Sequence, residues 1–289
     1  MTTEESMPAA WRTALENGEA ASRRHTLSLP RKALRGQHGT RAGTLSGVSL
    51  DFSDYREYHP GDDLRNLDWG VYARSDKLTV KLYHEEVAPH LDLLLDASAS
   101  MNLPDTRKAE AALALAAFFS GAAENAACSR SVWRLEERPV LFIEGKRPPS
   151  TWAAFEFAEG AAHRAVAGNW RPSGIRVLIS DLMWEVDPRL ILRSLSEKAA
   201  LVIVVQLLAA NELTPPVSGR YRLDNVEDQQ HFDLRMDETI RQRYVDLLAS
   251  HQAQWLEACQ QTGAVYTRVT DEAFLSDFRL HEFEQQGIL

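Results

Sequence analysis

From His90 onward, apolar stretches of strand length alternate with segments of helix length. The apolar stretches are 91–96, 131–135, 140–144, 175–180, 201–209 and 264–269. The helix-length segments are Asp105–Ala127, Ser150–Ala167, Pro188–Lys198, Asp237–Gln261 and Glu272–Glu284. The almost continuous Val, Ile and Leu of 91–95, 175–179 and 201–208 is typical of strands buried on both faces. We therefore predict an α/β fold with a doubly wound, mainly parallel sheet. Because no helix separates 131–135 from 140–144, we expect a hairpin there, with one antiparallel edge strand.

Residues 1–88 have a different pattern. Residues 1–40 are a polar and basic leader in which we expect one short helix, Ala9–Ala21. Residues 41–88 are expected to form a small β-rich module, since apolar and polar residues alternate over 78–83 as in a half-buried strand. Residues 89–289 then form the sheet domain.

Charge is distributed unevenly along the chain. The net charge of −9 argues against nucleic-acid binding through the whole surface. Between Ser22 and Gly43, however, there is no acidic residue, and the bases are Arg23, Arg24, Arg31, Lys32, Arg35 and Arg41. This segment is either a solvated lead-in or a site for acidic partners, phosphate or membrane lipid. We favour the lead-in, because no aromatic residue interleaves with the bases.

The remaining composition points to the cytoplasm. Cys128 and Cys259 have no CxxC spacing, which is typical of buried thiols in a reducing compartment. The N-terminus has no apolar segment of a secretory signal, and the apolar run 201–210 is too short to cross a bilayer. We expect a cytoplasmic protein with no integral membrane segment.

Polar side chains follow the first strand of the predicted sheet. Asp96 ends the strand, and Ser98 and Ser100 lie in the loop that leads to the next helix. Asp181 follows a later strand of similar character. In a doubly wound sheet such strand ends meet, and one or two carboxylates with hydroxyls suit Mg²⁺, with Mn²⁺ or Ca²⁺ as alternatives. The alternative is that the serines cap the helix and Asp96 closes a turn.

This pattern resembles the metal-ion-dependent adhesion site of von Willebrand factor A domains. Asp96, Ser98 and Ser100 match its D-x-S-x-S motif, and Asp181 matches its later aspartate. The family also uses a threonine from a loop between them, for which Thr151 is the candidate and Ser150 a substitute. The resemblance implies that the hydroxyls bind the metal directly and the aspartates largely through water. It also implies that the remaining position accepts a carboxylate of a partner protein.

The segment before the sheet domain resembles the family called domain of unknown function 58. Its members carry a similar Y-R-x-Y-x-P-G-D-D-x-R-x-x-D-W-x-x-x-A-R segment, and both resemblances together cover most of residues 36–280. Every position is present here: Tyr55, Arg56, Tyr58, Pro60, Gly61, Asp62, Asp63, Arg65, Asp68, Trp69, Ala73 and Arg74.

The charged residues of this segment allow two interpretations. Pro60-Gly61 suits a type II turn, and Asp62 or Asp63 could cap a short helix. We interpret the opposite charges as a structural network that fixes the β-rich module onto the sheet domain, with members Arg56, Asp62, Asp63, Arg65, Asp68, Trp69 and Arg74. The alternative is an anion-binding or partner-binding surface, or a catalytic acid/base set.

For function, we expect a non-enzymatic, Mg²⁺-dependent adaptor that docks partner or client proteins. The resemblance implies a MoxR-type AAA+ ATPase as the partner. The alternative is a Mg²⁺-dependent hydrolase or phosphatase on the same sheet. That alternative lacks its second acid, because residue 98 is serine. GxSxG, GxxxxGK[ST] and GxGxxG are also absent from the chain. In a weaker third hypothesis, residues 22–43 bind anionic lipid or nucleic acid.

Overall fold

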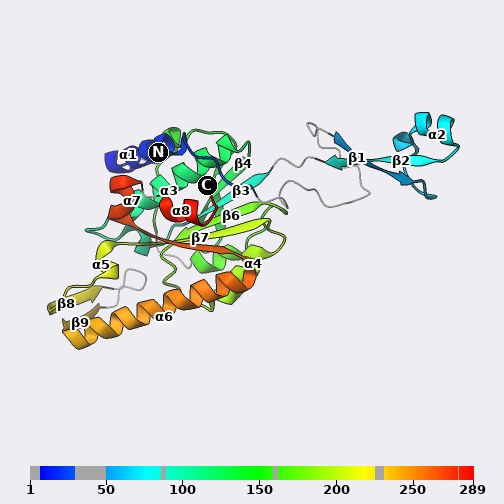
Figure 1. The fold of residues 1–289 in the computed structure, drawn as a ribbon. Coiled ribbons are helices and arrows are strands. Elements are labelled where there is room, and N and C mark those ends of the chain that lie inside the picture. Colours follow the sequence, from blue (N-terminus) through cyan, green and yellow to red (C-terminus); the bar gives the residue numbers. More distant parts are fainter. Residues whose placement is uncertain (1–6, 30–49, 86–88, 159–161, 225–230, 279) are drawn as a thin grey trace. The chain divides into compact units, whose positions relative to one another are not determined.

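A computed structural model describes residues 7–29, 50–85, 89–158, 162–224, 231–278 and 280–289 (Figure 1). The chain divides into two units, one with Met1–Leu29 and Pro89–Leu289, and one with Pro30–Ala88. We call them the sheet unit and the β unit and describe each by itself. In the described residues, no helix combines the length and apolar character needed to cross a membrane.

The sheet unit is built on six strands in the order β10-β7-β6-β3-β4-β5. In chain order they are β3 (His90–Asp96), β4 (Ser129–Leu135), β5 (Pro139–Glu144), β6 (Ile175–Ser180), β7 (Leu201–Leu208) and β10 (Val265–Thr270). All neighbours pair in parallel except β4 and β5, which form an antiparallel hairpin with β5 at the edge. The predicted α/β fold and its antiparallel edge strand are confirmed.

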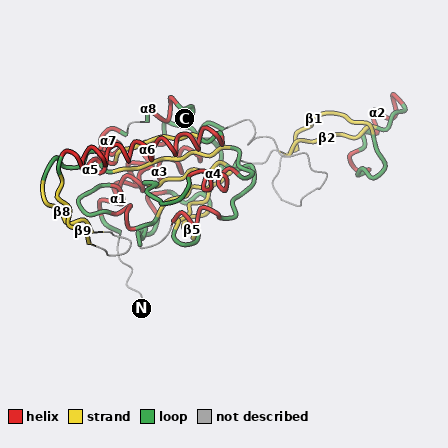
Figure 2. Tube along the Cα trace, turned by 90° about the horizontal axis from the view of Figure 1, so that it is seen from below, coloured by secondary structure: helices red, strands yellow, loops and turns green. Residues whose placement is uncertain are grey.

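Helices cover both faces of this sheet (Figures 1 and 2). Successive residues of a strand point to opposite faces, so Leu93 and Leu95 enter one core cluster and Leu94 the other. The first cluster contains residues of α1 (Ala9–Ser22), α3 (Lys108–Asn125), α7 (Asp271–Asp277) and α8 (His281–Gln285). The second contains residues of α4 (Pro188–Ser196) and α6 (Glu238–Thr262).

Helix α1 belongs to the sheet unit. It packs on α3 so closely that a Cβ at Gly18 would lie 2.2 Å from the carbonyl oxygen of Ala114. Leu15 is buried, and the Asn125 side chain donates hydrogen bonds to the carbonyl oxygens of Ser22 and His25. Residues 9–22 of the expected polar leader, 1–40, therefore form part of the sheet unit's core, while its residues 1–6 and 30–40 lie outside the described residues.

Two predicted helices differ from the structure. In the described residues of the segment 150–167, which leave out 159–161, the helical elements are 3₁₀ turns at Pro149–Thr151 and Ala162–Ala167. Between them Phe155 is buried in an aromatic cluster with Phe142 and Phe157, and Ala158 N donates to Ala97 O at 2.8 Å. These tertiary contacts hold the chain extended. The segment 272–284 is divided into α7 and α8, since Phe278 has the left-handed φ of 43° that ends α7.

Residues 210–236 also carry elements that the sequence did not reveal. Helix α5 (Ala210–Leu213) follows β7, and β8 (Gly219–Asp224) pairs with β9 (His231–Met236) in an antiparallel hairpin before α6.

The β unit contains a two-stranded antiparallel sheet, β1 (Leu50–Glu57) with β2 (Thr79–Glu85). Its connection holds a 3₁₀ turn, Leu64–Asn66, and helix α2 (Trp69–Ser75). Asp62 N donates to His59 O at 3.0 Å across Pro60-Gly61, and Gly61 has a φ of 108°, which glycine adopts without strain. The turn expected at this position is therefore formed.

Asp68 is the centre of the charged network in the β unit. Its Oδ1 accepts from the backbone N–H groups of Gly70 and Val71 and caps α2, while its Oδ2 accepts from Tyr55 Oη at 3.0 Å and pairs with Lys81 Nζ at 3.2 Å. The Val71 N–H, followed by Lys81 and Tyr55, lowers the pKa of Asp68 to about 2. Lys81 was missing from the predicted network.

The other predicted members make local contacts. Arg56 pairs with Asp62 at 2.8 Å, and Asp63 caps the 3₁₀ turn by accepting from Arg65 N. Arg74 donates to Gly70 O, and Trp69 is exposed and meets Tyr72 edge to face. Every contact described for these residues lies inside the β unit, and the role of the network as a tie to the sheet domain stays a prediction.

Replacing Gly18 by alanine tests the packing of α1. The added methyl group would clash with the backbone of Ala114, so we expect Gly18→Ala to reduce the free energy of unfolding by about 1–3 kcal/mol. Asn17→Ala, at the adjacent exposed position, is the control for helix propensity. Equal stability of the two variants in urea denaturation would contradict the packing.

Replacing Asp68 by alanine tests the β unit. The change removes the cap of α2 and an ion pair with Lys81, so amide hydrogen exchange should accelerate in α2 and β2 but not in β3. Asp63→Ala, which removes the cap of a 3₁₀ turn and an exposed ion pair with Arg65, is the matched control. Unchanged exchange at Gly70 and Val71 would rule out the network.

Candidate metal centre

The candidate site lies where the strand order reverses. From β3 the chain moves to β4 and β5 on one side, and it then returns to β6 on the other side of β3. Asp96 ends β3 and Asp181 directly follows β6, so the parallel pairing of these strands brings both residues to one edge. This reversal point is where doubly wound sheets bind ligands.

Asp96 is a fully buried carboxylate held by neutral donors. Its Oδ1 accepts from the backbone N–H of Ser98 at 2.9 Å, and its Oδ2 accepts from the Ser180 hydroxyl at 2.6 Å. Burial, followed by the nearby charge of Asp181, raises the pKa of Asp96 to about 6. The described contacts therefore give this carboxyl group no cationic partner.

The serine hydroxyls face each other. Ser98 Oγ and Ser100 Oγ are 3.0 Å apart, and Ser98 precedes the 3₁₀ turn Ala99–Asn102 without a capping hydrogen bond from its side chain. The alternative in which Ser98 serves as a cap is therefore wrong. Asp96, in contrast, does close the turn through Ser98 N.

Asp181 has a cationic partner that the sequence analysis missed. Lys108, in the first turn of α3, is fully buried, and its Nζ lies 2.9 Å from Asp181 Oδ2 and 3.0 Å from Glu212 Oε1. Burial lowers the pKa of Lys108, but Asp181 and Glu212 raise it by more, so the ammonium stays charged. The available signal was one lysine at the start of the apolar segment AEAALALAAFF.

Glu212 is held firmly beside this lysine. Its Oε2 accepts from Ala209 N at 2.7 Å, and its carbonyl oxygen accepts from the Tyr244 hydroxyl at 2.8 Å. Burial raises the pKa of Glu212, although Lys108 and Ala209 N lower it. The ion pair thus joins α3, the loop after β6 and α5, and the Tyr244 hydrogen bond joins α5 to α6.

The donors fit a divalent cation such as Mg²⁺. Two adjacent oxygen ligands of octahedral Mg²⁺ lie roughly 3.0 Å apart. The two hydroxyls already have this separation. Three carboxylates, those of Asp96, Asp181 and Glu212, surround one ammonium, that of Lys108. The net charge of these four groups is two negative charges, which a divalent cation would neutralise. Within the described ranges, no group of three His, Cys, Asp or Glu side chains has a metal-binding arrangement, so a cation at this place would also need the hydroxyls as ligands.

Thr151 and Ser150 have other contacts in the structure. Thr151 is exposed, and its hydroxyl donates to Pro148 O at 2.7 Å within its own turn. Ser150 N donates to Glu19 of α1 at 2.9 Å. The residue that pairs with Ser98 is Ala158. Hydrogen bonds connect Asp96, Ser98 and Ser100, and Asp181 lies nearby. None of the described contacts connects Thr151 or Ser150 to these residues.

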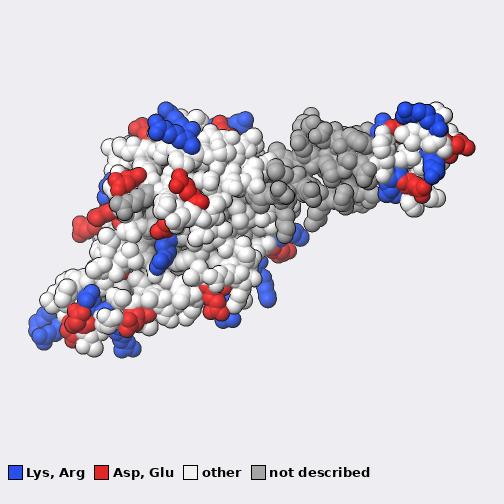
Figure 3. All heavy atoms as spheres, viewed as in Figure 1, with Lys and Arg blue, Asp and Glu red and all other residues white. Residues whose placement is uncertain are grey.

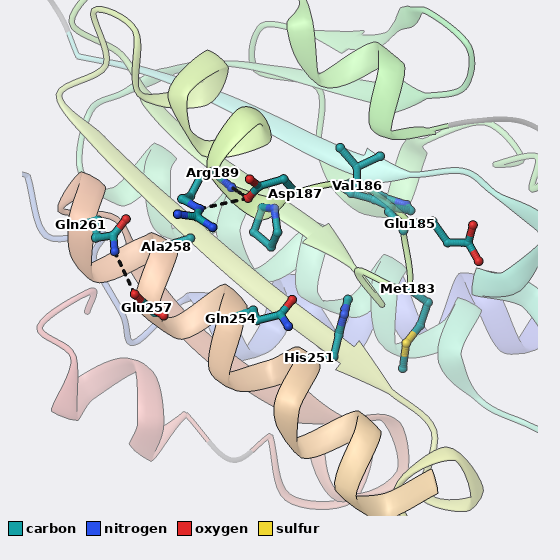
Figure 4. A pocket seen from close by; sticks show the side chains of 12 residues that line it. Met183, Glu185, Val186, Asp187, Arg189, His251, Gln254, Glu257, Ala258 and Gln261 are labelled. Atoms are coloured by element: carbon teal, nitrogen blue, oxygen red, sulfur yellow. Dashed lines mark hydrogen bonds and ion pairs between the residues drawn. The ribbon is translucent and has the colours of Figure 1, made fainter. Parts of the chain in front are cut away.

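Two pockets are lined in part by Met183, whose backbone N–H donates to Asp181 Oδ1. One, of about 660 Å³, lies between α6 and residues Met183–Arg189, which end in the first turn of α4, and Figure 4 shows His251 and Gln254 of α6 reaching toward it. The other, of about 630 Å³, is lined by Glu212, Tyr244, Leu247 and Leu248 and shares Met183 with the first. His251 Nε2 lies 2.8 Å from Leu182 O, which ties α6 to the loop after Asp181. Acidic and basic side chains are both scattered over the face drawn in Figure 3.

Comparisons with curated proteins found relatives over nearly the whole chain. An uncharacterised protein of Mycobacterium bovis, Mb1516, is 25% identical over 289 residues, covering 93% of this chain and 91% of that protein. The same values apply to the uncharacterised protein Rv1480 of Mycobacterium tuberculosis.

Comparisons with solved structures found similar chains. The conserved hypothetical protein BatB from Bacteroides thetaiotaomicron is 12% identical, with a TM-score of 0.37, covering 69% of this chain and 99% of that one. A von Willebrand factor type A structure from Catenulispora acidiphila is 13% identical, with a TM-score of 0.34, covering 71% and 44%. The family described as "Protein of unknown function DUF58" matches residues 54–254, which is more than half of the chain. The chain therefore belongs to the DUF58 family, as its charged segment predicted.

Proposed function

We propose that the sheet unit is a protein-docking module that binds Mg²⁺ at Asp96, Ser98 and Ser100, with Asp181 beside them. The observation that carries the proposal is the Asp96 carboxylate, which is buried among neutral donors and lies next to two hydroxyls 3.0 Å apart. A buried carboxylate without a cation is costly, and a bound cation removes that cost. When bound, Mg²⁺ supplies a positive charge that attracts a carboxylate of the partner protein.

The surroundings of the site support a protein partner. Met183 lies two residues after Asp181, lines both pockets and is 40% exposed, and Leu247 of α6 is 61% exposed. Apolar side chains beside a few polar groups are common in protein-binding surfaces. An acidic residue flanked by apolar residues would match both the cation and these pockets.

The partner that we propose is a MoxR-type AAA+ ATPase or a client of it. This part of the proposal is based on the family resemblance of the signature segment, residues 55–74. The chain has no GxxxxGK[ST] segment to hold a nucleotide phosphate, so any ATP hydrolysis would belong to the partner. We propose no catalytic residue, because Ser98 occupies the position where a phosphatase would need its second acid.

Mg²⁺ should stabilise the protein through Asp96. A cation present at ten times its dissociation constant adds about 1.4 kcal/mol, so we expect the Tm to rise by roughly 3–6 °C. Asp96→Asn should abolish the rise, whereas Glu16→Gln, an exposed acid on α1, should keep it. The measurement is thermal denaturation with Mg²⁺ or EDTA. An equal rise in Asp96→Asn would contradict the site, and phosphate-ester turnover that this change abolishes would support a hydrolase instead.

Asp96→Asn should also change the pH dependence of stability when EDTA is present. The pKa of Asp96 is raised from 3.8 to about 6 on folding. Its contribution to stability is therefore full below about pH 4 and is lost as the pH rises through 6. Asparagine avoids the buried charge, so the variant should gain up to about 3 kcal/mol over the native chain at pH 7.5 and less at pH 5. Urea denaturation at both pH values measures this, and a difference independent of pH would contradict the raised pKa.

A further inference from the structure

The buried ammonium of Lys108 is a fixed positive charge beside the metal centre. Lys108 is fully buried and contacts Asp181, in the loop after β6, and Glu212, in α5 after β7. A lysine in such a place is tolerated only when it is paired, and removing one partner leaves an uncompensated charge. Its position is also fixed, because Ala209 N and the Tyr244 hydroxyl hold Glu212.

We infer that Lys108 weakens the binding of a divalent cation to the free protein and thereby makes tight metal binding depend on an anionic partner group. This inference rests on the proposed function, since it concerns the same site. Lys108 neutralises the Asp181 oxygen that faces it and repels a second cation at the site.

The charge balance explains the dependence on a partner. With Lys108 present, the three carboxylates and the lysine carry two negative charges, and a divalent cation brings the total to zero. Without the lysine charge, the loaded site would keep one negative charge and would repel an incoming carboxylate. Lys108 therefore lowers the affinity of the free protein for the metal and allows the loaded site to accept an acidic group.

A purely structural role for the ion pair makes different predictions. A clamp that ties α3 to α5 requires the salt bridge but is indifferent to the total charge of the site. Variants that change the charge and the salt bridge separately can distinguish the two roles. Lys108→Met adds one negative charge, and Lys108→Met with Glu212→Gln restores the native total without the salt bridge. Glu212→Gln alone removes one negative charge, and Lys108→Arg keeps the native total.

The test is calorimetric titration of the full-length chain with Mg²⁺, with circular dichroism to verify folding. We expect Lys108→Met to bind at least about tenfold more tightly than the native chain, and Glu212→Gln more weakly. Lys108→Arg and the double variant should bind like the native chain. If Lys108→Met does not fold, the order of Glu212→Gln, the double variant and the native chain still decides the question. Affinities that follow stability rather than charge would overturn the inference.

Two further outcomes separate this inference from the proposed function. Sodium acetate, compared with an equal concentration of sodium chloride, should tighten Mg²⁺ binding to the native chain more than to Lys108→Met. An equal effect on both would overturn the role in partner acceptance. Binding of Mg²⁺ that requires Asp96 but is unchanged in the charge variants would overturn the inference and leave the proposed function intact. Absence of Mg²⁺ binding in every variant would overturn both.

Discussion

The parallel pairing of β3 with β6 is the interaction on which the candidate site depends. It places Asp96 and Asp181 at the adjacent ends of two fully buried strands, where an unpaired charge is unfavourable. The polar groups around them follow from that cost. Ser180 and the Ser98 backbone satisfy Asp96, while Lys108 and the Met183 backbone satisfy Asp181. The same pairing creates the hydrophobic cores and the charged edge.

The sheet could be predicted from the sequence because each strand is identified by residues that are adjacent in the chain. Runs of Val, Ile and Leu identify strands buried on both faces, and the absence of a helix between β4 and β5 identifies the hairpin. The meeting of Asp96 with Asp181 then follows from the topology of such sheets. The charged segment 55–74 predicted the family for a similar reason, since it is one continuous match.

Features that depend on tertiary contacts could not be predicted in this way. Lys108 belongs to the site only because α3 directs it toward a loop and a short helix that lie far along the chain. The segment 150–167 is long enough for a helix, but its residues 152–157 are not helical, because Trp152 and Phe155 pack around Phe142. The sequence of helix α1 suggests a polar leader, because the close packing of Gly18 on Ala114 becomes visible only in the structure.

Because α1 belongs to the sheet unit, the β unit is an insertion in the sequence of the sheet unit and does not precede it along the chain. The chain enters the sheet unit at its N-terminal end, leaves after Leu29 and returns at Pro89. Ser28 N donates to Ile288 O at 2.8 Å, so the residue just before Leu29 is hydrogen-bonded to the C-terminal segment of the sheet unit. A fragment that begins at Pro89 would expose the apolar face of α3. The sheet unit is one discontinuous folding unit, and dissecting the protein requires excising residues 30–88 and closing the gap with a linker.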